Sequence, residues 1–277
     1  MKNISNNYFV AEDWQDLQEY LFNNFDSSID RHRSNFVYRG VDDASFGLQT
    51  SIQRLGREPI DLESNLIRNF QKYSPINTLV DNYNNIWNWI ALGQHYGLQT
   101  RLLDWTFSPY VALHFSTEDL SKFDKDGAIW MVDFAAIIKY YPKNLQDKLV
   151  NDRIFSLTSN ELNTEIGDNI NKIYKYSRDN INTMIFFEPP SIDNRIINQY
   201  GLFSFMLDPN SDKLKWLEDK ENVFKKIIIP QKLKLEIRDK LDQANVSERV
   251  IYPGLDGISK WLKRWYSEKD DSKKWKI

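Results

Sequence analysis

Polar side chains are concentrated in one segment of the chain, GQHYGLQTRLLDWTFSPYVALHF at residues 93–115. The segment holds His95 and His114, two of the three histidines in the sequence, together with Arg101 and Asp104. An arginine among core-forming residues needs a carboxylate or a ligand, because an unpaired guanidinium is costly to remove from water. The segment therefore fits a reaction centre, a ligand pocket, or a structural unit in which Arg101 and Asp104 satisfy each other.

The sequence supports none of several common catalytic designs. His95 and His114 are far apart and belong to no HExxH or histidine-rich motif, so we expect no metal site. No serine lies in a Gly-x-Ser-x-Gly turn, and no glycine-rich loop opens a helix after a strand. The chain has no cysteine, which excludes disulfides, thiolate zinc sites and cysteine nucleophiles.

The overall charge gives no general attraction for nucleic acid. Lys and Arg number 36 and Asp and Glu 39, for a net charge of −3 at pH 7, so a binding groove would have to be locally basic. The most basic segment, 260–276, is interpreted as an amphipathic helix with a solvated tail. No apolar run reaches the roughly 20 residues of a membrane span, and residues 1–10 lack a signal-peptide pattern. We therefore expect a cytoplasmic protein without membrane contact.

The order of the expected elements predicts an α+β fold, with a mixed or antiparallel sheet as its core and helices at both termini. An N-terminal helical segment covers 1–34, the main domain 35–266 carries a polar helical insert near 136–180, and 267–277 form a basic tail. The predicted strands are 35–40, 127–134, 183–187, 201–207 and 224–229. The predicted helices outside the insert are 11–25, 61–73, 78–96, 109–115, 231–243 and 257–266.

Four motifs resemble those of the FRG domain, a bacterial family named for a Phe-Arg-Gly motif. They are YRG at 38–40, with tyrosine in place of phenylalanine, GQHYGLQTRLLDWT at 93–106, RIINQYGLF at 195–203 and IYPGLDGISKWL at 251–262. The resemblance implies a bacterial effector in a toxin or anti-phage defence setting. The candidate ligand-binding residues are Arg39, Gln94, His95, Tyr96, Thr100, Arg101, Asp104, Trp105 and Arg195.

The order of these motifs is also similar, more weakly, to that of arginine-serine-glutamate ADP-ribosyltransferases. That similarity implies NAD as the substrate, with Arg39 holding its phosphates or ribose. It places Thr100 or Thr106 near the serine position, and Tyr96 or Trp105 against the nicotinamide ring. At the position of the catalytic glutamate stands Gln199, which can hydrogen-bond a hydroxyl but carries no negative charge. The candidate carboxylates that would replace it are Glu63 and Glu188.

Two hypotheses follow for the function. The first is an ADP-ribosyltransferase-like enzyme that uses NAD, acts on a protein or nucleic-acid acceptor and is held in check by a neutralising partner. The second is a non-enzymatic module that binds a nucleotide-like ligand or nucleic acid. A carboxylate that faces Arg39 across a cleft would favour the enzyme, whereas burial of Asp104 against Arg101 would favour binding or a structural role.

Overall fold

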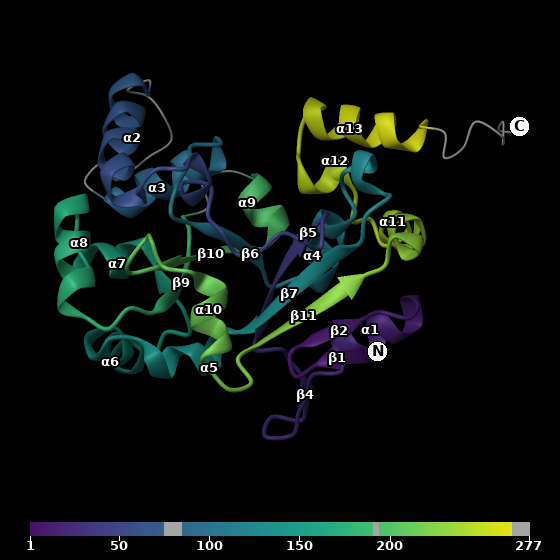
Figure 1. The fold of residues 1–277 in the computed structure, drawn as a ribbon, viewed down its shortest axis with the longest axis horizontal. Helices are drawn as coiled ribbons and strands as arrows, with labels where there is room; N and C mark the ends of the chain where they lie inside the picture. Colours follow the sequence, from purple (N-terminus) through teal and green to yellow (C-terminus); the bar gives the residue numbers. More distant parts are fainter. Residues whose placement is uncertain (75–84, 191–193, 268–277) are drawn as a thin grey trace, which may run out of the picture.

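The computed structural model describes residues 1–74, 85–190 and 194–267, and a nine-stranded mixed sheet is its core (Figure 1). Neighbouring strands are antiparallel except for the parallel pairs β2–β11 and β8–β9. In order across the sheet the strands are β1 (Lys2–Ser5), β2 (Tyr8–Val10), β11 (Phe224–Ile229), β7 (Gly127–Asp133), β5 (Phe36–Val41), β6 (Leu103–Thr106), β10 (Gly201–Met206), β9 (Met184–Glu188) and β8 (Leu157–Thr158).

The sheet is weakly joined in its middle. Strand β5 pairs with β7 along its whole length, but with β6 at a single position, Tyr38 opposite Thr106. The two halves, β1-β2-β11-β7-β5 and β6-β10-β9-β8, therefore diverge on either side of this contact. The residue that follows Tyr38 in β5 is Arg39, so the first motif lies where the sheet opens.

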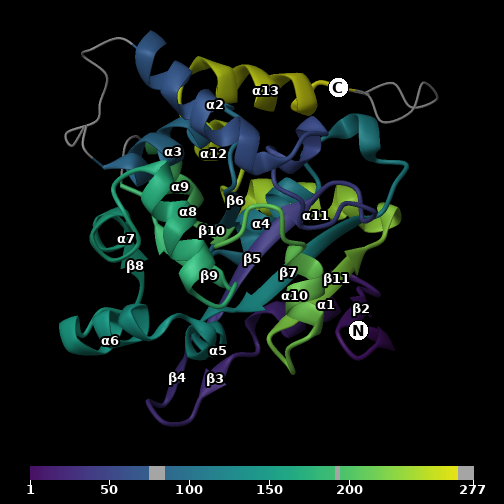
Figure 2. The same ribbon diagram turned by 60° about the vertical axis from the view of Figure 1, so that its left-hand side comes forward.

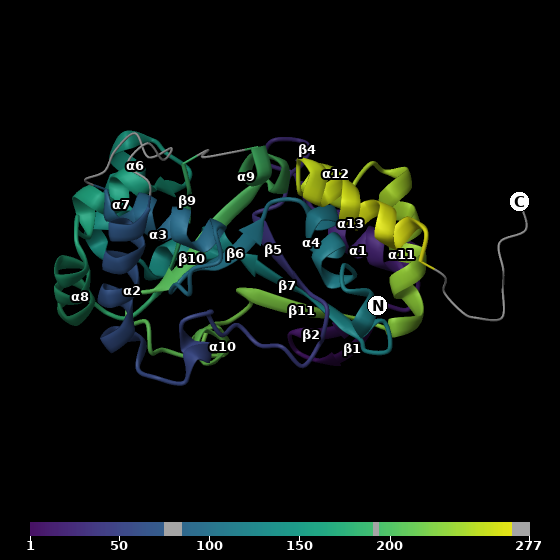
Figure 3. The same cartoon turned by 90° about the horizontal axis from the view of Figure 1, so that it is seen from above.

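Helices cover both halves of the sheet (Figure 3). The first group, at the end that holds the N-terminus, contains α1 (Trp14–Phe22), α4 (Pro109–Ser116), α11 (Lys234–Gln243), α12 (Glu248–Ile251) and α13 (Leu255–Trp265). The second group, at the opposite end, contains α2 (Pro59–Tyr73), α3 (Ile86–His95), α6 (Lys143–Asp152), α7 (Ser159–Glu165) and α8 (Ile170–Asp179). Three short helices lie next to strands in the chain. Helix α5 (Phe134–Ile137) follows β7, α9 (Asn194–Gln199) precedes β10, and α10 (Lys213–Glu218) precedes β11.

Two apolar clusters hold these layers together. In one, Leu17 and Leu21 of α1 and Ile237 and Leu241 of α11 pack with Tyr38 of β5. The other, larger cluster joins β6, β9 and β10 to α3 and to the helices of 136–180. Because β7 is buried on both faces over nearly its whole length, its sequence GAIWMVD reads as a continuous apolar run.

Several helix ends carry residues that are typical of helix caps. Asp13 accepts a hydrogen bond from the amide of Asp16 and begins α1, and Ser108 does the same for α4 with the amide of Val111. Gly97 follows α3 with φ of 84°, as expected for a glycine after a helix. Of the predicted helix 78–96, residues 78–84 lie outside the described residues.

The N-terminal segment needs a correction. Residues 1–34 were predicted to be helical, yet besides α1 they contribute β1 and β2 to the edge of the sheet. They also form a projecting hairpin of β3 (Phe25–Asp26) and β4 (Arg31–His32) (Figure 2). These strands are only two to four residues long, so no periodicity could reveal them. None of the helices in the described ranges has both the length and the apolar character required to cross a membrane.

Candidate functional site

A cavity of about 260 Å³ opens where β5 and β6 diverge. We call it the Arg39 cavity. Its wall combines residues of β5, α3, β6, α4 and α9, and thereby brings together the first three motifs of the sequence. The lining residues are Tyr38, Arg39, Gly40, Gln94, Asp104, Trp105, Thr106, Phe115, Arg195 and Gln199.

The three residues of the Tyr-Arg-Gly motif have separate roles. Tyr38 is buried, and its hydroxyl lies 3.0 Å from that of Ser34. Gly40 lies against α4 so closely that a Cβ atom would be 1.9 Å from the main-chain oxygen of Ala112. Only glycine permits that approach. Together, the buried tyrosine and the close helix contact fix the strand that directs Arg39 into the cavity.

Arg39 is anchored by Asp104. Its Nη1 donates to the main-chain oxygen of Asp104 at 2.8 Å and lies 3.7 Å from the carboxylate Oδ2. The Arg39 side chain is 20% exposed, and its Nε has no hydrogen-bond partner among the described residues. Burial lowers the pKa of Arg39, but a guanidinium remains protonated at physiological pH. The cavity therefore contains a permanent positive charge with unused donor capacity.

A chain of hydrogen bonds orients the carboxylate of Asp104. Thr100 Oγ1 donates to Gln94 Oε1 at 2.5 Å, and Gln94 Nε2 donates to Asp104 Oδ2 at 2.9 Å. Because an ionised carboxylate can only accept, the amide nitrogen of Gln94 must face Asp104, and the amide oxygen is left to accept from Thr100. The Asp104 side chain is 58% exposed, so it remains open to a ligand. The spacing of Gln94, Thr100 and Asp104 in the second motif is thereby explained.

Gln199 and Thr106 join the cavity to α9. Thr106 Oγ1 donates to the main-chain oxygen of Gln199 at 2.7 Å. Gln199 Nε2 lies 3.5 Å from the main-chain oxygen of Ile251, a contact that reaches toward the C-terminal helices. Gln199 thus lines the cavity and links it to the segment before α13.

Glu63 lies elsewhere, in a buried ion pair. Arg101 Nε donates to Glu63 Oε1 at 2.6 Å, Arg101 Nη2 contacts Glu63 Oε2, and both side chains are 1% exposed. The hydroxyl of Tyr174 donates to the same carboxylate at 2.8 Å. Arg101 is therefore not paired with Asp104, and neither Arg101 nor Glu63 lines the Arg39 cavity.

Glu188 also lies outside the Arg39 cavity. It ends β9 and lines a separate hollow of about 870 Å³ with Phe155, Tyr200 and other residues. Burial raises the pKa of Glu188, and a hydrogen bond to Ser156 opposes that shift. Of the described residues that line the Arg39 cavity, Asp104 is the one carboxylate.

The aromatic candidates are placed differently from one another. Trp105 lines the cavity but is 3% exposed, and its Nε1 donates to Ser204 Oγ at 2.8 Å. Its ring packs edge-on against Phe186, which makes it a core residue. His95 and Tyr96 end α3 with their rings 5.0 Å apart, and neither lines the cavity. Tyr96 is 60% exposed.

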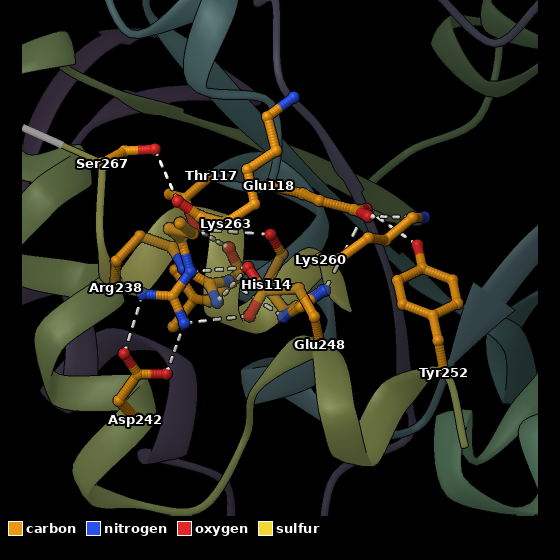
Figure 4. A network of polar contacts seen from close by, with 12 residues as sticks. His114, Thr117, Glu118, Arg238, Asp242, Glu248, Tyr252, Lys260, Lys263 and Ser267 are labelled. Atoms are coloured by element: carbon orange, nitrogen blue, oxygen red, sulfur yellow. Dashed lines mark hydrogen bonds and ion pairs between the residues drawn. The ribbon is translucent and has the colours of Figure 1, made fainter. Parts of the chain in front are cut away.

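His114 belongs to a buried polar network that sequence analysis missed (Figure 4). Arg238 Nη1 lies 2.9 Å from His114 Nδ1, and Arg238 Nη2 donates to Glu248 at 3.0 Å. Arg264 donates to Glu248 and to both carboxylate oxygens of Asp242. Since arginine can only donate, His114 Nδ1 is an acceptor and Nε2 carries the proton.

This network keeps His114 neutral. Burial, and after it the charge of Arg238, lower the pKa of His114 to about 3. The imidazole ties α4 to α11 and does not face the Arg39 cavity. Within the described parts of the chain, no three His, Asp or Glu side chains are grouped so as to hold a metal ion.

Comparisons with known proteins agree with the first of the two resemblances. The family model described as "FRG domain" matches residues 34–125, which include β5, α3, β6 and α4. No curated protein and no solved structure matches the chain. The segment that supplies Arg39, Gln94 and Asp104 to the cavity is therefore an FRG domain.

Proposed function

We propose that the Arg39 cavity binds a nucleotide-like anionic ligand, with Arg39 as its anchor. The observation that carries the proposal is the partly exposed guanidinium, whose Nε has no hydrogen-bond partner among the described residues. A guanidinium presents its donors as a planar fork that suits phosphate and carboxylate oxygens. A buried donor without a partner is costly unless a ligand satisfies it.

The size and lining of the cavity agree with such a ligand. Sites for small molecules are usually concave, have volumes of roughly 300–1,000 Å³ and combine apolar walls with a few converging polar groups. At about 260 Å³, the Arg39 cavity lies just below this range, so it suits a sugar with one phosphate or with one ring better than a whole dinucleotide. Thr106, Asp104 and Gln199 supply polar groups, and Phe115 supplies an apolar wall.

A second candidate function is cleavage of NAD, and the exposed carboxylate of Asp104 favours it. In this reaction the bond between ribose C1 and the nicotinamide nitrogen breaks, and its electron pair leaves with nicotinamide. A hydroxyl or amine of a protein or nucleic-acid acceptor, or water, then bonds to C1 and loses a proton. Asp104 would stabilise the positive charge that develops on the sugar. The carboxylate role would thus belong to Asp104 and not to Gln199, Glu63 or Glu188.

The motifs suggest a setting for this chemistry. As an FRG-domain effector of a bacterial toxin or anti-phage system, the enzyme would need a neutralising partner until it is required. This setting is part of the second candidate only, since a binding module needs no such restraint.

One experiment separates the two candidates. Binding of NAD, ADP-ribose and ribose 5-phosphate is measured by calorimetry for the wild type, Arg39→Ala and Asp104→Asn, and nicotinamide release is followed by mass spectrometry with and without bacterial lysate. Binding that Arg39→Ala abolishes, without release, supports the ligand-binding module. Release that Asp104→Asn abolishes, while binding persists, supports NAD cleavage. Absence of binding by the folded wild type would overturn both candidates.

A further inference from the structure

A second, larger cavity adjoins the first. It has a volume of about 830 Å³ and lies between α9 and the start of α13. We call it the C-terminal cavity. Its lining residues are Arg195, Tyr252, Pro253, Gly254, Asp256, Ser259 and Lys260. Arg195 also lines the Arg39 cavity, so the two cavities are neighbours that share one cationic side chain.

The fourth motif builds the wall of this cavity. Gly254 has φ of 105°, a conformation that residues with a side chain rarely adopt. Gly257 packs so tightly that a Cβ atom would be 1.8 Å from the main-chain oxygen of Tyr252. Gly254 holds the N-cap position of α13, which leaves Asp256 in the first turn of the helix, beside the cavity. The two glycines thus fold the chain back so that Tyr252 and α13 enclose one space.

Two cations gather around one aromatic ring in the C-terminal cavity. The guanidinium of Arg195 lies 5.0 Å, and the ammonium of Lys260 4.0 Å, from the centre of the Tyr252 ring. Lys260 is 54% exposed and lies 3.6 Å from Glu118, so it can turn toward a ligand. Charged hydrogen bonds from such groups are the strongest available to a phosphate. Asp256 and Ser259 add groups that can bond the hydroxyls of a sugar.

The charges beyond Lys260 limit the length of the ligand. The next hollow along the surface is lined by three cations, Lys260, Lys263 and Arg264, and by four carboxylates, Asp42, Glu118, Asp119 and Glu248. A nucleic-acid strand that continued past Lys260 would bring its phosphates to these carboxylates, which would repel it. A short ligand that ends in the C-terminal cavity avoids them. The arrangement favours a single nucleotide unit over a polymer.

We propose that the C-terminal cavity binds the nucleoside diphosphate half of a ligand whose other end occupies the Arg39 cavity. Arg195 and Lys260 bind the diphosphate, and Asp256 and Ser259 bind its sugar. The proposal rests on the proposed function, because the Arg39 cavity must hold the remainder of the same molecule. The proposal specifies the class of the ligand, which is a dinucleotide or a nucleoside-diphosphate sugar. The Arg39 cavity alone is too small to hold such a molecule.

The test compares two lysines of the same helix. Lys260→Gln and Lys263→Gln remove the same charge three residues apart on α13, but of the two only Lys260 lines the C-terminal cavity. Calorimetry with ADP should show affinity about tenfold weaker for Lys260→Gln, and within about twofold of the wild type for Lys263→Gln. Arg195→Gln is the second variant and should weaken ADP binding in the same direction. Circular dichroism checks that all three variants are folded.

The binding of ADP-ribose and the binding of ADP test the two cavities separately. Arg39→Ala should weaken the binding of ADP-ribose but not that of ADP. If Arg39→Ala changes neither while Lys260→Gln weakens both, the proposed function is overturned and the nucleotide site stands. If ADP fails to bind the wild type, or Lys260→Gln and Lys263→Gln weaken its binding equally, the nucleotide site is overturned. Binding of a single-stranded oligonucleotide in preference to ADP would likewise overturn it, in favour of a nucleic-acid surface.

Discussion

Arg101 and Glu63 form a two-point ion pair in the interior of the protein, between the second motif and α2. Each side chain is 1% exposed. Arg101 Nη1 also lies 3.4 Å from the main-chain oxygen of Leu207, and its guanidinium lies 5.3 Å from the ring of Tyr174. Arg101 therefore serves the fold, whereas its neighbours in the motif, Gln94 and Asp104, line the Arg39 cavity.

Replacement of Arg101 by Met should destabilise the protein strongly. The variant leaves the Glu63 carboxylate buried without its partner, which costs about 3–5 kcal/mol. The free energy of unfolding from urea titrations measures this loss. The double variant Arg101→Met, Glu63→Leu should recover much of it, and Arg68→Met, at an exposed position of α2, should change stability by no more than about 0.5 kcal/mol. Equal stability of Arg101→Met and the wild type would contradict the structural role.

This pair shows where sequence reasoning reaches its limit. Arg101 and Asp104 are three residues apart and of opposite charge, but in an extended segment such residues point to opposite sides. Glu63 is 38 residues upstream, and nothing in its local sequence indicates its partner. Partners that lie on different elements are fixed only by tertiary packing, and the same is true of His114, Arg238 and Glu248.

Arg39→Ala should weaken ligand binding while the fold remains. Loss of a charged hydrogen bond to a ligand costs about 1.5–3 kcal/mol, or roughly 10- to 150-fold in affinity. The native contact that is lost, to the main-chain oxygen of Asp104, contributes about 0.5–1.5 kcal/mol to stability. Calorimetry and thermal unfolding of the same samples separate the two effects.

The matched control for this variant is Arg54→Ala. Arg54 is exposed and donates to the main-chain oxygen of Gln49, and its charge is close enough to lower the pKa of Arg39. The Arg54→Ala variant removes the same positive charge, and Arg54 does not line the Arg39 cavity. A comparable loss of affinity in both variants would show that Arg39 acts through general electrostatics and not as an anchor.

Gln94→Leu should weaken the binding of the same ligand through the position of Asp104. The variant removes the donor to Asp104 Oδ2 and the acceptor for Thr100 Oγ1, so the carboxylate loses its fixed orientation. Thr100→Val breaks the same chain one step earlier. If the chain acts as a unit, the double variant should lose little more affinity than Gln94→Leu alone, because coupled residues are not additive.

The control for this series is Gln99→Leu, since the exposed Gln99 donates to the main-chain oxygen of Gly97 in the same turn and does not line the Arg39 cavity. It should bind ligand as the wild type does. Additive losses in the Gln94 and Thr100 double variant would mean that the two residues act independently of each other.

The motifs located the candidate site better than they assigned its chemistry. Arg39, Gln94, Asp104, Arg195 and Gln199 do meet in one cavity, although they come from four different elements, β5, α3, β6 and α9. The C-terminal cavity was not foreseen, since it depends on α9 docking against α12 through a hydrogen bond from Asn198 Nδ2 to the main-chain oxygen of Val250. The edge strands β1 and β2 were missed because the sheet, not their own sequence, makes them strands.

The last prediction concerns pH and a buried lysine. Lys213, at the start of α10, is 2% exposed, and its Nζ has no hydrogen-bond partner among the described residues. Burial, and after it the charges of Arg101 and Arg39, lower the pKa of Lys213 from 10.5 to about 7, which Asp212 partly opposes. Between pH 7 and 10.5 the unfolded chain binds more protons at this position than the folded protein. Stability should therefore rise with pH through that window, and below about pH 7 the cost of the buried charge is fully present.

Lys213→Met removes the titrating group and should raise the melting temperature at pH 7 by several degrees. The gain over the wild type should shrink as the pH approaches 10, because the wild-type amine is then neutral in the folded protein. Thermal unfolding at pH 6, 7, 8, 9 and 10 gives both curves, and Lys215→Met, at an exposed position of the same helix, is the matched control that should follow the wild type. A Lys213→Met curve parallel to that of the wild type across this range would show that Lys213 keeps its ordinary pKa in the folded protein.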